Sequence, residues 1–119
     1  NVSATVRERI QKVTDALLAK KARGEAWTVS DNELMRRTIR RACALRIVDL
    51  VKEGVGMYES VKIAYLESGM NVTEEQIQET ARTFEANWDA FVKSAPVEIV
   101  SDAEFAEILR TAQKGTVLA

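Results

Sequence analysis

The chain has 119 residues, of which 46% are hydrophobic and 29% are charged, and its formal net charge is −1. This length suits one globular domain over residues 1–119, and the composition excludes a disordered or fibrous chain. No apolar run approaches the roughly 20 residues that a membrane span needs, and the first residues lack the basic-then-apolar pattern of a secretory signal, so we expect a cytoplasmic protein with no membrane contact.

The first predicted helix begins after Thr5. Thr5 and Glu8 have the spacing of a capping box, in which the threonine hydroxyl accepts a hydrogen bond from the Glu8 amide and the glutamate reaches back. Cations followed by Gly24 place the end of this helix near Arg23. Its apolar residues form a narrow stripe that suits packing against one partner helix: Val6, Ile10, Val13 and Leu17.

The connection after this helix contains Trp27, and a loop tryptophan usually folds back over the edge of a core. The spacing of Ser30 and Glu33 then predicts a second capping box. A long central helix over about residues 31–53 follows. It ends at Gly54, because glycine is costly inside a helix and readily adopts the left-handed backbone of a turn.

The central helix has two different halves. In its first half one side is apolar and the other is basic, which indicates a surface helix, whereas from Ala42 onward apolar residues occur on every side, which indicates burial. Cys43, the only cysteine, falls near the core side, where an inert buried thiol is usual, and no internal disulfide can form. Four arginines make up the basic side: Arg36, Arg37, Arg40 and Arg41.

Two further helices are predicted before the only proline. Residues 57–68 form a short helix that stops at Gly69, and Thr73 with Gln76 makes a third capping box for the next helix. We interpret the aromatic rings of that second helix as core residues rather than as a cofactor site. Its apolar stripe is Ile77, Ala81, Phe84, Trp88 and Phe91.

Pro96 cannot continue this helix and predicts an extended linker. Ser101 to Glu104 is a fourth capping box, which opens a last helix ending near Gly115. No alternating strand pattern is visible, so the predicted fold is all-α, a compact five-helix bundle around the central buried helix. The expected core residues are Ile39, Leu45, Val48, Leu50, Phe84, Trp88 and Phe91.

The charge is unevenly distributed along the chain. Residues 1–62 contain thirteen Lys and Arg against eight Asp and Glu, whereas residues 63–119 contain four against ten, so the two parts carry net charges of +5 and −6. Three interpretations follow: the parts pair within one molecule, they pair between subunits, or the basic part meets an anionic partner.

The residues that usually carry catalysis and metal binding are scarce. There is no histidine, which is the commonest general base near neutral pH and the commonest metal ligand, and no phosphate-binding glycine loop. Glu74, Glu75 and Glu79 share one end of a helix, where the helix dipole explains acidic residues adequately. We therefore expect a protein that is not an enzyme, with no catalytic residue, no metal site and no cofactor.

The four arginines are the least ordinary feature. They form two i,i+4 rows of like charge, and arginine is suited to bidentate contacts with phosphate or carboxylate, so an anion is expected to face them. Residues 61–80 fail as a helix-turn-helix, because Glu74 and Glu75 follow the turn where a recognition helix needs cations.

We expect a regulatory or accessory module that binds an anionic macromolecule, such as nucleic acid or an acidic protein, through Arg36, Arg37, Arg40 and Arg41. The alternative is a self-associating interaction module, a homo-dimer at least, in which the basic half pairs with an acidic surface. The narrow stripe of the first helix is the sequence feature that favours this alternative.

Overall fold

The computed structural model describes residues 3–95, 103, 104, 106 and 107, and this part of the chain contains helices and no strand. The predicted all-α bundle is therefore confirmed. The helices are α1 (Val6–Ala22), α2 (Val29–Lys52), α3 (Met57–Ser68), α4 (Glu74–Ala86) and α5 (Trp88–Ser94).

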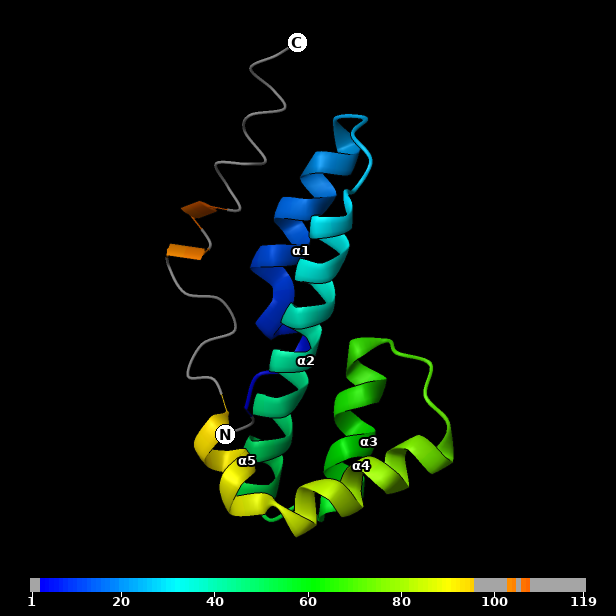
Figure 1. The fold of residues 1–119 in the computed structure, drawn as a ribbon, viewed down its shortest axis with the longest axis vertical. Helices are drawn as coiled ribbons and strands as arrows, with labels where there is room; N and C mark the ends of the chain where they lie inside the picture. Colours follow the sequence, from blue (N-terminus) through cyan, green and yellow to red (C-terminus); the bar gives the residue numbers. More distant parts are fainter. Residues whose placement is uncertain (1–2, 96–102, 105, 108–119) are drawn as a thin grey trace.

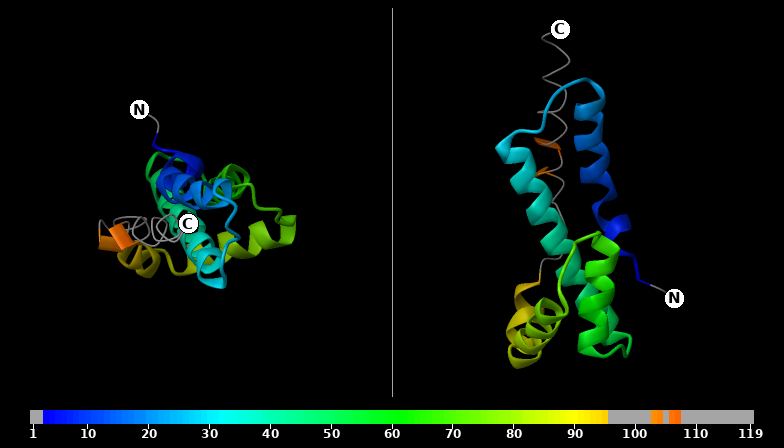
Figure 2. Two further views of the ribbon diagram at one scale, coloured as in Figure 1. Left: turned by 90° about the horizontal axis from the view of Figure 1, so that it is seen from above. Right: turned by 90° about the vertical axis from the view of Figure 1, so that its right-hand side faces the viewer.

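The two longest helices define the architecture. α1 and α2 form an antiparallel hairpin along the long axis, α3 lies beside the lower half of α2, and α4 crosses below α3 (Figure 1). The side view in Figure 2 shows that α3 also packs near the start of α1. The outer half of the hairpin extends beyond α3 and α4, so the first half of α2 keeps an open side.

Local capping signals set most of the helix ends, as predicted. Thr5 caps α1 with Glu8, and Thr73 caps α4 with Gln76, each through the full reciprocal capping box. α3 spans the predicted residues 57–68 and stops at Gly69, which has a φ of 76° in the left-handed region.

The predicted start of the central helix was wrong by two residues. Thr28, not Ser30, is the cap: its hydroxyl accepts from the Asp31 amide at 3.1 Å, and the Asp31 carboxylate accepts from the Thr28 amide at 2.8 Å. The same carboxylate binds Lys20 at 2.7 Å. Because this ion pair joins α1 to α2, a tertiary contact selects one of two overlapping capping boxes. Trp27 folds back onto α1 as expected, since its Nε1 donates to the Leu17 carbonyl at 2.8 Å.

The single aromatic helix that we expected is divided in two. Asn87 has φ −125° and ψ 30°, outside the helical region, and separates α4 from α5. Its side-chain amide donates to the Thr83 carbonyl at 3.1 Å, which is the kind of local bond that competes with helix continuation. The aromatic stripe survives the break, because Phe84 and Phe91 stack with ring centroids 4.1 Å apart.

The end of the chain is described only in part. The expected linker at Pro96 and most of the last predicted helix lie outside the described residues. Ala103, Glu104, Ala106 and Glu107 are described and are helical.

The centre of the core differs from the predicted one. Val48 and Leu50 are buried as expected, but the rings of Phe84 and Phe91 are only partly buried at the edge, and Trp88 lies outside the main cluster. The buried cluster instead draws aliphatic and alanine side chains from α1, α2, α3 and α4, so the packing centre lies among these four helices. The cluster consists of Val6, Ile10, Ala42, Cys43, Ile47, Val61, Ala64, Ile77 and Ala81.

Replacing Ile47, which is 1% exposed in this cluster, by Ala should lower the free energy of unfolding by about 2–5 kcal/mol, through lost transfer energy and the cavity left behind. Urea unfolding measures this loss. Leu66→Ala is the control, because Leu66 is 65% exposed and its loss should change stability by less than about 0.5 kcal/mol. Equal effects of the two changes would contradict this core.

Candidate anion-binding face

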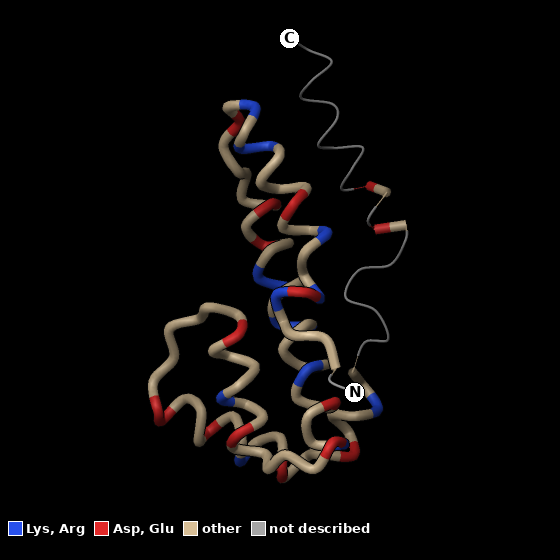
Figure 3. The backbone as a smooth tube through the Cα atoms, turned by 180° about the vertical axis from the view of Figure 1, so that it is seen from behind, with Lys and Arg blue, Asp and Glu red and all other residues tan. Residues whose placement is uncertain are grey.

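The four predicted arginines lie together on the outer side of α2. Arg36, Arg37 and Arg40 are exposed and Arg41 is partly buried, whereas Thr38 on the opposite side of the helix is buried. The helical period of 3.6 residues separates the two sides. Many of the Lys and Arg positions follow the α1–α2 hairpin, as Figure 3 shows. We call Arg36, Arg37, Arg40 and Arg41 the arginine face.

The two rows of the arginine face have different partners. Arg37 Nη2 and Arg41 Nη1 each lie 3.6 Å from one carboxylate oxygen of Glu104. Arg36 and Arg40 form no ion pair within the described part of the chain. The row of Arg36 and Arg40 is therefore the part of the face that is open to a ligand.

The carboxylates considered as internal partners from sequence lie elsewhere. No described ion pair joins the arginine face to Glu74, Glu75 or Glu79. Glu74 instead accepts hydrogen bonds from the Tyr58 hydroxyl and, at 3.3 Å, from the Gln78 amide. The hydrogen bond that Tyr58 donates to Glu74 raises the pKa of the Tyr58 hydroxyl.

A groove of about 540 Å³ runs beside the open row. Ile39 and Met70 supply apolar surface, and Glu33 is the one acidic residue among its described lining residues. A ligand here would meet guanidinium groups along one wall and apolar side chains beside them. The described lining is Glu33, Arg36, Arg37, Ile39, Arg40 and Met70.

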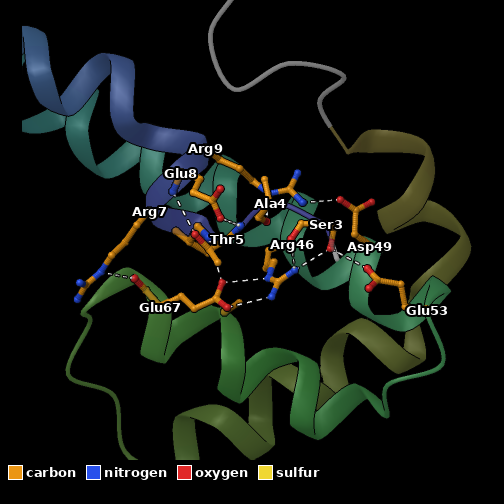
Figure 4. A network of polar contacts seen from close by, with 12 residues as sticks. Ser3, Ala4, Thr5, Arg7, Glu8, Arg9, Arg46, Asp49, Glu53 and Glu67 are labelled. Atoms are coloured by element: carbon orange, nitrogen blue, oxygen red, sulfur yellow. Dashed lines mark hydrogen bonds and ion pairs between the residues drawn. The ribbon is translucent and has the colours of Figure 1, made fainter. Parts of the chain in front are cut away.

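A fifth arginine of α2, which sequence analysis did not single out, has a different role. Arg46 is 5% exposed and binds both carboxylate oxygens of Glu67, at 3.0 and 2.9 Å (Figure 4). Its remaining terminal nitrogen donates to the Ser3 carbonyl at 3.1 Å and to the Ser3 hydroxyl at 2.6 Å. Glu67 also accepts from the Val6 amide at 3.0 Å. Arg46 and Glu67 thus join α2 to α3, to Ser3 and to the first turn of α1.

Further polar contacts surround this pair. Arg7 Nε donates to the Glu67 carbonyl at 3.0 Å, Arg9 pairs with Asp49, and the Ser3 hydroxyl donates to Glu53 at 2.7 Å. The sequence signal for such a network was an arginine in a stretch that is otherwise apolar on all sides, because a buried cation requires a carboxylate.

The apolar stripe of α1 is used inside the molecule. Val6, Ile10, Val13 and Leu17 are all buried. The stripe therefore gives no argument for self-association, and a dimer stays a prediction without support from this surface.

The chain has no match among known protein families, curated proteins or solved structures. None of the described helices is both long and apolar enough to cross a bilayer. Among the residues placed by the structure, no three side chains of the usual metal-binding types come together.

Cys43 should be chemically inert in the folded protein. Burial raises the pKa of its thiol to about 11, and the sulfur faces the Ala64 carbonyl at 3.9 Å. At pH 8 the thiolate fraction is then far below that of an unfolded chain, whose thiol has a pKa of about 8.5. We expect iodoacetamide to modify Cys43 rapidly in urea and very slowly without it. Equal rates in both conditions would contradict the burial.

The Arg46–Glu67 pair should behave as one unit. Glu67→Met leaves a buried guanidinium without its carboxylate and should cost about 3–5 kcal/mol of unfolding free energy. Adding Arg46→Met removes the stranded charge, so the double variant should be more stable than the sum of the two single losses predicts. Urea unfolding of the four proteins measures the coupling, and additive losses would show that the pair contributes nothing specific.

Proposed function

We propose that this chain is a non-enzymatic regulatory or accessory module that binds an anionic macromolecule through the arginine face. The observation that carries the proposal is the open row of Arg36 and Arg40, which forms no ion pair with any described carboxylate and borders a groove. The scarcity of catalytic groups supports the non-enzymatic part: the chain has no histidine, and its single thiol is protonated at neutral pH.

Arginine favours phosphate as the recognised group. Its planar guanidinium presents paired donors that match a phosphate or carboxylate, and it is less strongly hydrated than an ammonium group. Four such groups on one helix face suit a repeating polyanion better than a single small ion. Nucleic acid is therefore the proposed ligand, and an acidic protein surface is the competing one.

Recognition by this face should depend little on nucleotide sequence. The arginines contact a backbone readily, and Asn32, the exposed amide side chain one turn before Arg36, donates to the Thr28 carbonyl at 3.0 Å. Backbone contacts of this kind give dissociation constants of about 10⁻⁴ to 10⁻⁶ M at physiological salt.

Binding to labelled duplex and single-stranded oligonucleotides should weaken steeply between about 50 and 200 mM salt, because each neutralised phosphate releases counterions. The double variant Arg36→Ala with Arg40→Ala should lower the slope of log affinity against log salt by about two. Fluorescence anisotropy measures both effects.

The control removes the same charge elsewhere. Arg82→Ala with Lys93→Ala changes two exposed cations on α4 and α5, so it alters the net charge equally but should leave the slope nearly unchanged. Equal effects of the two double variants would refute a localised face. Absence of any oligonucleotide binding, with the protein folded, would favour an acidic protein as the partner.

A further inference from the structure

A short helical segment lies beside the outer half of the α1–α2 hairpin. It contains Ala103, Glu104, Ala106 and Glu107 and is drawn in orange in Figures 1 and 2. A groove of about 610 Å³ is lined by this segment on one side and by the hairpin on the other. The hairpin contributes apolar surface from Leu17 and Leu34 and the basic side chain of Arg37.

Glu104 occupies the place where a ligand oxyanion would contact the arginine face. One of its carboxylate oxygens lies 3.6 Å from Arg37 Nη2 and 3.6 Å from Arg41 Nη1. These two arginines are one turn apart and form one of the two like-charged rows. The carboxylate therefore offsets their mutual repulsion, as a bound phosphate would.

The contact has the properties of one that another anion can replace. Its 3.6 Å separations are longer than the 2.7–2.9 Å typical of a charge-assisted hydrogen bond. The side chain of Arg37 is 48% exposed and that of Glu104 is 39% exposed, so water screens the pair. By contrast, the Arg46–Glu67 pair has a 2.9 Å contact, and the Arg46 side chain is 6% exposed.

We propose that Glu104 is a built-in competitor for the anionic ligand of the arginine face. In the free protein it neutralises Arg37 and Arg41 and leaves Arg36 and Arg40 as the first contact for an incoming polyanion. Full engagement of the four arginines then requires displacement of Glu104. This inference rests on the proposed function, and it explains how one face can carry an internal ion pair and still bind a ligand.

The test uses the full chain and a fluorescein-labelled single-stranded oligonucleotide of about 20 nucleotides at low salt. Glu104→Gln keeps the shape of the side chain and removes its charge, so it should tighten binding by roughly three- to tenfold. Glu85→Gln is the matched control, because it makes the same change in net charge at an exposed position on α4. This control should change the affinity by less than twofold.

A second measurement follows the segment itself. In the parent protein the oligonucleotide should shift the amide NMR signals of Ala103 and Ala106 toward their positions in Glu104→Gln, because both conditions free the segment from Arg37 and Arg41. Unchanged signals at saturating oligonucleotide, or equal affinities of Glu104→Gln and Glu85→Gln, would overturn the competitor role.

The outcomes separate this inference from the proposed function. If the parent binds, and Arg36→Ala with Arg40→Ala weakens that binding, but Glu104→Gln does not strengthen it, the proposed function stands and the competitor role fails. If no variant binds, including Glu104→Gln, nucleic acid is excluded as the ligand and the competitor role against it fails, whereas an acidic protein remains the competing partner for the arginine face. Binding by Glu104→Gln alone would support the competitor role and would overturn the claim that Arg36 and Arg40 are open to a ligand in the free protein.

Discussion

The buried pair of Arg46 and Glu67 is the constraint on which the inner half of this molecule depends. A guanidinium that is 5% exposed needs every donor satisfied, and here its partners come from α3, from Ser3 and, through Glu67, from the first turn of α1. The three helices must therefore meet in one arrangement for the charge to be tolerated. Replacing such a pair with apolar groups is often neutral for stability, so its main consequence here is a defined register between α1, α2 and α3.

The same helix holds arginines in two opposite situations, and burial decides which role each one has. Arg46 lies where α2 is covered by α1 and α3, so its donors are used for folding. Arg36 and Arg40 are exposed on the first half of α2, where a like-charged i,i+4 pair costs only about 0.2–0.5 kcal/mol. So small a cost does not require an internal carboxylate. The hairpin can keep the row of Arg36 and Arg40 open for a ligand without loss of the fold.

Much of the helix content could be predicted because capping is a local signal. Thr5, Thr73 and Gly69 act within a few residues, and the structure places all three as expected. The failures have tertiary causes: Lys20 pairs with Asp31 of the Thr28 cap, and the buried cluster, drawn from α1, α2, α3 and α4, leaves Phe84 and Phe91 at its edge. The arginine face itself was visible as a periodic pattern. Its partner was not, because charge alone cannot choose Glu104 over Glu74, and the partners of Arg46 are separated from it by 21 and 43 residues.

The uneven charge of the chain is partly resolved inside the molecule. Three ion pairs join the basic part of the sequence to the acidic part: Arg46 with Glu67, and Arg37 and Arg41 with Glu104. For these side chains the two parts of the chain therefore pair within one molecule. What remains is a basic outer hairpin and an acidic α4, with Glu75, Glu79 and Glu85 exposed. The electrostatic potential of this charge distribution repels a polyanion from α4 and attracts it to the hairpin. A proposed nucleic-acid ligand would accordingly lie along the first half of α2. The length of this half helix, and not the size of the whole protein surface, would then limit how much of the ligand contacts the protein.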